Sequence, residues 1–393
     1  MANGSHWSVV GCRLSILQCA PRRRARGAAV RIVITGGGTG GHLFPALAVH
    51  DALRARRPEA TALFVGAAAG VEATILPRRG HAFRGLQAPR VSGTGLRKRC
   101  AAALALPGTV RQAMGCLREF RPQVVFGVGG YASVPTMAAA ALTRIPRVIH
   151  EQNALPGLAN RTLGRIASAV AVSFADTVRF FPAGRVQVTG NPVRAEIRAG
   201  DPGPARRRFG LAPEAFTVLV FGGSQGARRL NRAILEALPE LARERDDVQF
   251  VHATGAQDLA DVRRGYEASG VPARVESFIE DIALAYQAAD FVVCRAGAGT
   301  IFELAAVGKP ALLVPFPFAA NDHQRVNAEA AVQAGAAWVL LDQHCDGRRI
   351  AASVRAAREK RDRLAEMGRR ARTLATPDAA ERIVDLLERV ASV

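Results

Sequence analysis

Short apolar runs alternate with helical segments along most of the chain, and this alternation occupies two successive halves. The first half carries six strand-like runs: Ile32–Thr35, Ala62–Val65, Val124–Val128, Arg147–His150, Ala169–Val172 and Val186–Thr189. The second half carries six more: Thr217–Phe221, Gln249–Ala253, Arg274–Glu276, Phe291–Cys294, Ala311–Val314 and Ala337–Leu340. A rhythm of strand, helix and strand is typical of a parallel sheet with helices on both faces. We therefore predict an α/β fold with two doubly wound domains.

The boundary between the domains is predicted where the apolar periodicity stops. Glycine, proline and charged residues dominate the stretch Gly190–Gly210, which is typical of a linker. We expect an N-terminal domain at residues 30–192 and a C-terminal domain at residues 193–373. Residues 374–393 are expected to form a helix that packs back on the N-terminal domain. Its apolar residues share one helical face: Ile383, Leu386, Leu387 and Val390.

Residues 1–29 precede the first strand and are expected to form a disordered extension. The short apolar piece Leu14–Ala20 is followed by the basic run Pro21–Gly27, whereas a secretion signal places its positive charge before the apolar core. Two alternatives stay open, a start codon assigned too far upstream and a basic arm that touches acidic lipid.

Composition points to an anionic partner. The chain of 393 residues carries 53 Lys and Arg against 33 Asp and Glu, a net charge of +20, and such a surface attracts nucleic acid, anionic lipid or a pyrophosphate. No basic stretch is interleaved with aromatic residues that would stack on bases, so we expect no nucleic acid. The six cysteines are scattered without paired spacing, which argues against a zinc site and favours a reducing cytoplasm.

Any membrane contact is expected to be peripheral, because no apolar run reaches the roughly 20 residues that span a bilayer. The candidate is Val91–Arg111, a basic loop followed by an apolar stretch. In a membrane-facing arrangement the apolar side chains enter the interface, and Arg97, Lys98 and Arg99 meet acidic headgroups. The alternative is a loop followed by an ordinary amphipathic helix.

Each half also contains a glycine-rich turn where a predicted strand passes into a helix. The first turn lies within Arg31–Leu47 and the second within Val218–Asn231. Glycines let backbone N–H groups approach an anion, and the positive end of the following helix favours negative charge. Neither turn continues with the Lys-Ser or Lys-Thr pair of a nucleoside triphosphate hydrolase. The pair of turns predicts phosphate-bearing ligands between two lobes, although such turns also serve to pack a helix on a sheet.

Eight short motifs follow one another along the chain: GGGTGGHLFP (Gly36–Pro45), GVGGYASVP (Gly127–Pro135), HEQNALPGLAN (His150–Asn160), TGNPVR (Thr189–Arg194), GGSQGA (Gly222–Ala227), FIEDI (Phe278–Ile282), CRAGAGTIFE (Cys294–Glu303) and DHQ (Asp322–Gln324). Together they resemble the MurG family, the UDP-N-acetylglucosamine transferases that act on N-acetylmuramyl-pentapeptide pyrophosphoryl-undecaprenol in bacterial wall synthesis. The resemblance extends from about Val30 to the end of the chain.

The resemblance implies a GT-B glycosyltransferase, with two Rossmann-like domains facing a central cleft. It implies an inverting transfer of N-acetylglucosamine from UDP-N-acetylglucosamine to the C4 hydroxyl of the lipid-linked muramyl sugar, with neither cofactor nor metal. It also implies a peripheral location on the cytoplasmic face of the bacterial cell membrane, with other wall-synthesis proteins as further partners.

For the donor, the resemblance implies a site made mostly by the C-terminal domain. The second turn with Ser224 would hold the diphosphate, Glu303 would accept hydrogen bonds from the ribose hydroxyls, and the backbone of Ile279 would contact uracil. The remaining donor residues would line the sugar and diphosphate: Arg194, Ala298, Gly299, Thr300, Ile301, Phe302, Gln324 and, from the N-terminal domain, Thr39, Gly40, Gly41 and Asn153. For Thr39, Gly40 and Gly41 the alternative ligand is the pyrophosphate of the acceptor. For Glu303, Arg194 and Gln324 the alternatives are a solvated helix face, a hinge salt bridge and an exposed polar side chain.

His42 is the candidate general base. It opens a helix whose positive end disfavours the imidazolium form, so the neutral ring can take a proton from the acceptor hydroxyl. The alternative is that His42 only binds phosphate or orients the turn. Glu151 is the second candidate base. The residues expected near the acceptor are Tyr131, His150 and Asn160. The alternatives are a structural role for Tyr131, an acid/base role for His150 beside Glu151, and anchoring of a loop by Asn160.

Three other functions stay open. One is a different enzyme of the same architecture, such as a UDP-sugar epimerase or a transferase for another lipid. A second is a nicotinamide-dependent dehydrogenase, although no acidic residue ends a strand about 20 residues after Gly41 to bind an adenosine ribose. The third is a non-catalytic basic scaffold for assembly at the membrane.

Overall fold

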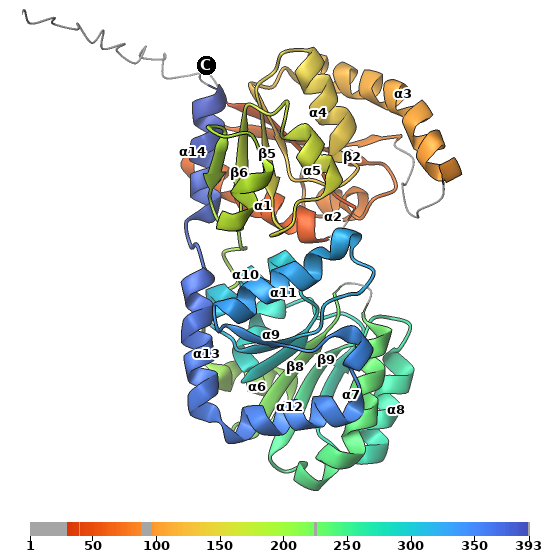
Figure 1. The fold of residues 1–393 in the computed structure, drawn as a ribbon, viewed down its shortest axis with the longest axis vertical. Helices are drawn as coiled ribbons and strands as arrows, with labels where there is room; N and C mark the ends of the chain where they lie inside the picture. Colours follow the sequence, from red (N-terminus) through yellow and green to blue (C-terminus); the bar gives the residue numbers. More distant parts are fainter. Residues whose placement is uncertain (1–29, 39, 88–95, 224–225, 392–393) are drawn as a thin grey trace, which may run out of the picture.

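Each half of the chain forms its own parallel sheet, and the two resulting lobes are stacked along the long axis of the molecule (Figure 1). The structure is a computed structural model that describes residues 30–38, 40–87, 96–223 and 226–391, without the side chains of residues 96–103. The predicted α/β architecture with two doubly wound sheets is confirmed.

The N-terminal sheet has seven strands in the order β3-β2-β1-β4-β5-β6-β7. They are β1 (Arg31–Thr35), β2 (Thr61–Ala67), β3 (Phe83–Leu86), β4 (Val124–Gly127), β5 (Arg147–Glu151), β6 (Ala169–Val172) and β7 (Val186–Val188). The helical segments of this half are α1 (Gly40–Arg56), α2 (Glu72–Arg78), α3 (Leu96–Phe120), α4 (Ser133–Leu142), α5 (Leu158–Leu163) and the 3-10 helix η1 (Ala175–Phe180).

Alternate residues of β1 show why both faces of this sheet are covered. Ile32 and Ile34 pack in one core with α1, whereas Val33 packs in the opposite core with Leu117 of α3 and Met137 of α4. All are nearly inaccessible to solvent. A strand buried on both sides reads as a continuous apolar run, so the sequence reveals it directly.

The C-terminal sheet has six strands in the order β10-β9-β8-β11-β12-β13. They are β8 (Phe216–Phe221), β9 (Val248–Ala253), β10 (Ala273–Glu276), β11 (Phe291–Cys294), β12 (Ala311–Leu313) and β13 (Ala337–Val339). The helical segments are α6 (Pro202–Phe209), α7 (Arg228–Leu241), η2 (Ala242–Glu244), α8 (Leu259–Ser269), α9 (Ile282–Ala288), α10 (Ala298–Val307), η3 (Ala320–Asp322), α11 (His323–Gln333), η4 (Asp342–His344), α12 (Gly347–Glu359) and α13 (Arg361–Leu374).

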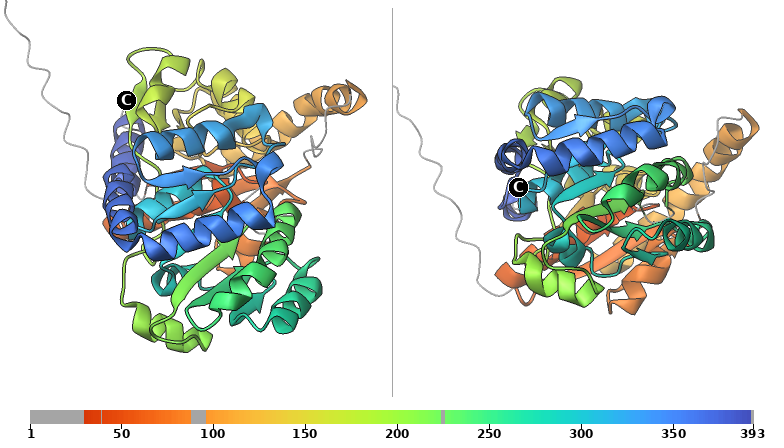
Figure 2. Two further views of the ribbon diagram at one scale, coloured as in Figure 1. Left: turned by 60° about the horizontal axis from the view of Figure 1, so that its bottom comes forward. Right: turned by 90° about the horizontal axis from the view of Figure 1, so that it is seen from below.

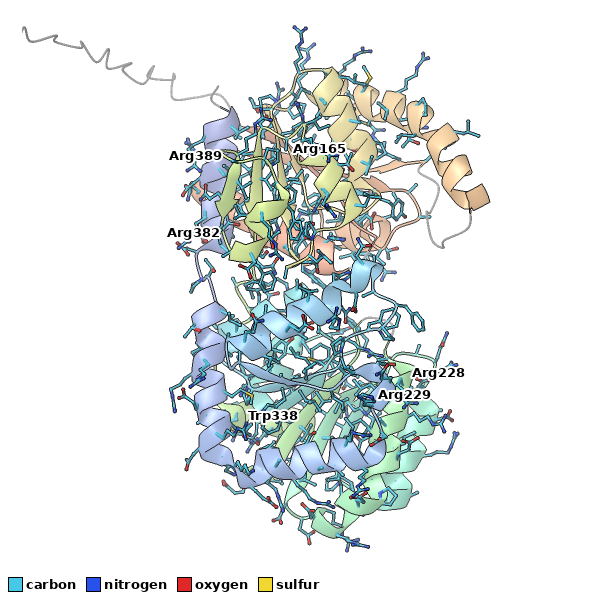
Figure 3. The ribbon with its side chains drawn as sticks, viewed as in Figure 1. Arg165, Arg228, Arg229, Trp338, Arg382 and Arg389 are labelled. Atoms are coloured by element: carbon cyan, nitrogen blue, oxygen red, sulfur yellow. The ribbon has the colours of Figure 1, made fainter. Side chains whose placement is uncertain are left out.

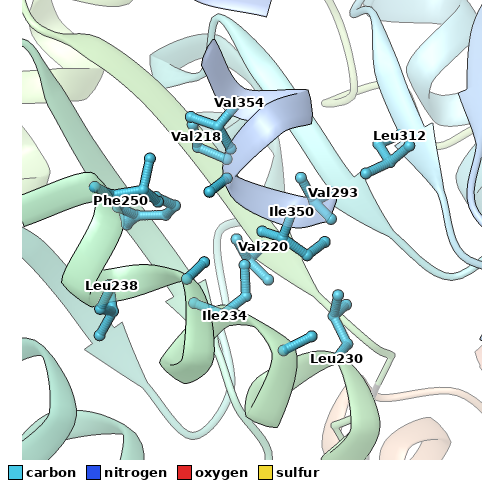
Figure 4. Close-up of a cluster of buried hydrophobic side chains, with 14 of the residues drawn as sticks. Val218, Val220, Leu230, Ile234, Leu238, Phe250, Val293, Leu312, Ile350 and Val354 are labelled. Carbon is cyan, nitrogen blue, oxygen red and sulfur yellow. The ribbon is translucent and has the colours of Figure 1, made fainter. Parts of the chain in front are cut away.

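One core of this lobe lies between the sheet and the pair α7 and α12 (Figure 4). Val218 and Val220 of β8 face Ile234 of α7 and Ile350 of α12 in this core. The next residue of the strand, Leu219, packs in the opposite core with α9 and α10. The sheet therefore holds α10 rigidly on its second face.

The chain crosses between the lobes twice, and the two crossings touch. A Cβ on Gly190, just after β7, would lie only 2.3 Å from the Cβ of Thr376. After the second crossing, α14 (Ala379–Ala391) packs on α1 of the N-terminal lobe, where Ile383 and Leu387 are buried. The last helix thereby ties the end of the chain to the first lobe.

The structure adds one strand that the sequence did not predict, and it does not describe two segments for which we made predictions. The edge strand β3 was not predicted, because its four residues include Arg84 and Gly85 and lack an apolar run. Residues 1–29 and Val91–Gly95 lie outside the described residues. In the described part of the chain, no helix combines the length and the apolar character that crossing a membrane requires.

Candidate active site

The first glycine-rich turn lies between β1 and α1, and it closes around a buried carboxylate. Gly36, Gly37 and Gly38 have positive φ angles of 145°, 142° and 89°, a conformation that favours glycine. A Cβ on Gly37 would lie 2.4 Å from Oε1 of Glu72. The Glu72 side chain is buried and accepts hydrogen bonds from the N–H groups of Gly38 (2.9 Å) and Ala67 (3.1 Å). A side chain of this protein therefore already fills the turn.

The start of α1 is the part of this turn that is left for an anion. Gly40 and Gly41 are its first two residues, and N–H groups in the first turn of a helix have no partner within the helix. Thr39 lies outside the described residues. Because Glu72 takes the N–H of Gly38, we expect an anion at Gly40 and Gly41 rather than at the glycines before them.

His42 stands at the meeting point of two glycine-rich turns. A Cβ on Gly129 would lie 3.3 Å from its Cε1, and a Cβ on Gly130 would lie 3.4 Å from its Cδ2. Its Nδ1 is buried without a hydrogen-bond partner. Burial lowers the pKa of His42, and the charge of Glu151 partly opposes that change. A neutral imidazole is the form that can accept a proton.

Tyr131 lies against the same turn. It is half-buried, and a Cβ on Gly38 would lie 3.4 Å from its Cε1. His323, at the start of α11 in the C-terminal lobe, contributes to lowering the pKa of His42. The site around His42 therefore receives electrostatic influence from both lobes.

Glu151, the second candidate base, holds a loop in place. Its Oε1 accepts hydrogen bonds from the N–H (2.9 Å) and the Nδ2 (3.0 Å) of Asn153. Its Oε2 accepts from the N–H of Gly157 (3.2 Å) and the Nδ2 of Asn160 (2.9 Å). A buried carboxylate with four donors has no lone pair free for a substrate proton. This geometry favours His42 as the base.

His150 and Asn160 lie inside the N-terminal lobe rather than on its surface. His150 is fully buried, with Nε2 at 3.3 Å from Gly190 O and 3.2 Å from Ser173 Oγ. Burial lowers its pKa to about 3. Asn160 donates from Nδ2 to the carbonyl of His150 (3.1 Å). Both side chains contact protein atoms in this conformation.

Glu303 occupies the middle of α10, close to the other lobe. Its Oε1 accepts from Arg194 (3.2 Å) and its Oε2 accepts from the hydroxyl of Tyr286 (2.9 Å). The guanidinium of Arg194 also lies 4.4 Å from the ring centroid of Phe44 in α1. Burial raises the pKa of Glu303, while Arg194 and Tyr286 act to lower it. Of the alternatives, a solvated helix face is excluded for Glu303.

The other predicted donor residues surround α10. Ile301 and Phe302 are buried, as is Ile279, so only the backbone of Ile279 is suited to contact a base. Gly299 has open space where a Cβ would be, so a larger side chain would fit there. Gln324 accepts the N–H of Phe316 at its Oε1 (2.9 Å), which leaves its amide NH₂ as a donor. Ala298 and Thr300 complete the first turn of α10.

The second glycine-rich turn joins β8 to α7 and is backed by main chain. A Cβ on Gly226, whose φ is +75°, would lie 2.0 Å from the carbonyl oxygen of Thr254. That oxygen accepts a hydrogen bond from Nδ2 of Asn231 in α7 (2.8 Å). Arg228 and Arg229 begin α7 (Figure 3). Ser224 lies outside the described residues.

Among the residues that the structure describes, three contacts between the lobes involve predicted residues. Asn327 of α11 is fully buried, accepts the N–H of Ala154 (2.9 Å) and donates to Oδ1 of Asn153 (3.1 Å). The rings of Phe174 and Phe302 pack 5.1 Å apart. The third contact is the stacking of Arg194 on α1 described above. Donor residues and the His42 helix are thus brought to one boundary.

Three residues of this boundary were missed by the sequence reasoning, namely Glu72, Tyr286 and Asn327. Glu72 and Asn327 lie in stretches without a motif. Their importance is apparent only from their hydrogen bonds to Gly38 and Asn153, which are distant in the sequence. Tyr286 is one of three tyrosines in the chain, which is the one sequence signal that could have pointed to it. Among the described residues, no three or more His, Cys, Asp or Glu are grouped so that they could hold a metal ion.

Family models match both lobes. The glycosyltransferase family 28 N-terminal domain matches residues 32–172, and the glycosyltransferase family 28 C-terminal domain matches residues 217–383. The fold and the matched domains define a glycosyltransferase of the GT-B architecture. UDP-N-acetylglucosamine 2-epimerase from Neisseria meningitidis shares this fold at a TM-score of 0.65 and 14% identity, covering 92% of this chain and 100% of the epimerase.

Closer relatives specify the family. The UDP-N-acetylglucosamine–N-acetylmuramyl-(pentapeptide) pyrophosphoryl-undecaprenol N-acetylglucosamine transferase of Geobacter sp. (strain M21) is 47% identical over 90% of this chain and 95% of the relative. The enzyme of that name from Myxococcus xanthus is 42% identical over 91% and 92%. The crystal structure of Acinetobacter baumannii MurG superposes with a TM-score of 0.73 at 30% identity, over 92% of this chain and 99% of that one. The chain belongs to the MurG family.

Proposed function

We propose that this chain transfers N-acetylglucosamine from UDP-N-acetylglucosamine to the C4 hydroxyl of undecaprenyl-pyrophosphoryl-N-acetylmuramyl-pentapeptide, in peptidoglycan synthesis. One observation carries the proposal. Arg194 binds Glu303 of α10 and also lies over Phe44 of α1, the helix that carries His42, in a chain 47% identical to a transferase of that activity.

The donor binds mainly to the C-terminal lobe. The second glycine-rich turn and the start of α7 hold the diphosphate, because a helix N-terminus with free N–H groups neutralises an anion without a metal. Glu303 accepts the ribose hydroxyls. The free NH₂ of Gln324 donates to the sugar, and its fixed Oε1 orients that donor.

The acceptor reacts on the side of the N-terminal lobe. His42 takes the proton of the C4 hydroxyl as its oxygen attacks C1 of the donor sugar, the C1–oxygen bond to UDP breaks, and UDP leaves with that electron pair. One displacement inverts C1 and forms a β1,4 bond. Glu151 and Asn327 fix the side chain of Asn153, which we expect to contact the sugar. Closure of the lobes excludes water, which would compete with the acceptor.

The N-terminal lobe also provides the surface for the lipid. Helix α3 projects from the body of this lobe (Figure 2) and packs on α4. Leu104 in α3 is 82% exposed and Leu142 at the end of α4 is 68% exposed, with Arg111 and Arg144 exposed nearby in sequence. Apolar residues mixed with basic ones suit an anionic bilayer surface. The side chains of Arg97, Lys98 and Arg99 lie outside the described part of the chain.

A product assay tests the reaction. Purified protein is incubated with radiolabelled UDP-N-acetylglucosamine, with and without the undecaprenyl-linked muramyl-pentapeptide. We expect one labelled disaccharide lipid for each UDP released, and negligible UDP release without the acceptor. Conversion of the donor into another UDP-sugar without any lipid would instead identify an epimerase.

A vesicle assay tests the membrane surface separately. The protein is expected to sediment with phosphatidylglycerol vesicles and not with phosphatidylcholine vesicles, and L104D is expected to reduce the bound fraction. Equal sedimentation of L104D and the unchanged protein would exclude α3 from the contact.

A further inference from the structure

Tyr286 is a buried side chain that the reaction scheme leaves without a role. It lies on α9, and its exposed fraction is 0%. Its hydroxyl donates to Oε2 of Glu303 at 2.9 Å. Its ring packs edge-on against Phe221, with 6.0 Å between centroids and 74° between planes. Phe221 is the last residue of β8, immediately before the second glycine-rich turn, so Tyr286 touches both parts of the expected nucleotide site.

The direction of this hydrogen bond is fixed. Burial, together with the nearby Glu303 charge, raises the pKa of Tyr286 well above its usual value of 10.0. The phenol therefore keeps its proton throughout the working pH range and can only donate to the carboxylate. A hydrogen bond donated to an ionised oxygen stabilises the charged form and sets its orientation.

The two supports of Glu303 differ in where they come from. Arg194 follows the first crossing between the lobes and stacks on Phe44 of the N-terminal lobe. Tyr286 and Glu303, in contrast, both belong to the C-terminal lobe, 17 positions apart. The hydroxyl of Tyr286 is thus the support that does not depend on how the lobes are arranged.

We propose that Tyr286 is a positioning residue for donor recognition, whose hydroxyl holds the Glu303 carboxylate in the orientation that accepts the ribose hydroxyls of a uridine nucleotide. This inference rests on the proposed role of Glu303. In this proposal Tyr286 does not contact the nucleotide. It acts through its hydrogen bond to Oε2 of Glu303.

The test compares UDP with 2′,3′-dideoxy-UDP, which lacks the ribose hydroxyls, by isothermal titration calorimetry. Y286F removes one oxygen and keeps the ring. We expect Y286F to weaken UDP binding about 10-fold or more, the size of one hydrogen bond to a charged group, and to leave dideoxy-UDP binding unchanged. The loss should grow as pH falls toward 5, because Glu303 is then more easily protonated.

A matched control and a reference variant separate the outcomes. Y266F removes the hydroxyl of another buried tyrosine in the same lobe, which faces His252, and it should leave the preference for UDP unchanged. E303Q should abolish that preference. If E303Q retains it, the ribose role of Glu303 is wrong. If E303Q abolishes it and Y286F does not reduce it, or if Y286F weakens both nucleotides equally, the inference about Tyr286 is overturned.

A second measurement does not depend on the folding of Y286F. The chain contains three tyrosines, so labelling with 3-fluorotyrosine gives three ¹⁹F resonances, assigned with Y266F and Y131F. UDP should shift the resonance of Tyr286 more than dideoxy-UDP does. Equal shifts with the two nucleotides would contradict the proposed contact through Glu303.

Discussion

The two glycine-rich turns look alike in the sequence and differ in what they enclose. The first closes on the carboxylate of Glu72, which takes the N–H of Gly38. The second closes on the carbonyl of Thr254 and leads into Arg228 and Arg229. A buried acid disfavours a second anion at close range, whereas a helix start with two arginines favours one. We therefore expect different tasks from the two turns, with proton transfer beside the first and binding of the donor diphosphate at the second.

Removing the imidazole of His42 is expected to give the largest loss of activity. It tests whether proton transfer takes place beside the first turn. H42A should lower kcat by on the order of 100-fold or more, as loss of a general base does. The dissociation constant for UDP should change less than about threefold, because we propose that the donor diphosphate binds at the other turn. Steady-state kinetics and calorimetry measure the two quantities. An unchanged kcat would remove His42 as the base.

The same residue gives a pH test. Burial lowers the pKa of His42 below 6.5, so the base stays neutral until the pH falls under that value. The acid limb of the kcat/KM profile, which reports the free enzyme, should therefore lie below pH 6.5. A limb above pH 6.5 would mean that His42 is not the titrating group.

Adding a methyl group to the second turn should give the next largest effect. G226A places a Cβ 2.0 Å from the Thr254 carbonyl, and we expect UDP affinity to fall on the order of 100-fold as the turn is displaced. G210A is the matched control, since Gly210 has a similar φ of +69° but nothing within 4 Å of a Cβ. Equal losses in the two variants would show that backbone strain, not the position of the turn, controls binding.

Changing the acid of the first turn should affect stability more than donor binding. E72Q can replace an accepting oxygen with an NH₂ group that faces backbone donors, which costs about 1 to 3 kcal/mol of unfolding free energy. Thermal unfolding should occur about 5 °C lower, while UDP affinity stays the same. A large gain in UDP affinity would instead show that Glu72 keeps nucleotide from the first turn.

Each lobe also holds a buried neutral histidine. The dependence of stability on pH that these two histidines cause should be the smallest of the expected effects. Burial lowers the pKa of both His150 and His252 to about 3. Between pH 6.5 and 3 the unfolded chain binds protons that the folded chain does not, so stability falls as pH falls. At pH 5.5 each histidine should lower the free energy of unfolding by about 1.4 kcal/mol relative to pH 7.5. Urea unfolding at both pH values, with H252Q for comparison, measures this loss.

The fold was largely predictable because its strands are buried on both faces. Val218 and Leu219 face different cores, so the whole of β8 is apolar and visible in the sequence. The edge strand β3 contains Arg84 and Gly85 between Phe83 and Leu86. No apolar run marks it, and only pairing with β2 creates it.

The site was predictable where a motif carries it and not where distant partners complete it. His42 and Glu303 lie in motifs that the family resemblance identifies. Glu72 acts on a residue 34 positions away, and Asn327 binds Asn153 across 174 positions and two lobes. Such pairs depend on how the sheets and lobes are placed, which local sequence does not encode. Tyr286 could not be predicted for the same reason, because its partner Glu303 lies on a different helix.

A crystal structure of the protein with UDP-N-acetylglucosamine tests the division of tasks most directly. The account predicts diphosphate oxygens within about 3 Å of the N–H groups of Gly222–Gly226 and the start of α7, with Glu72 still bound to Gly38. Diphosphate bound at Gly36–Gly38, with the Glu72 side chain displaced, would contradict it.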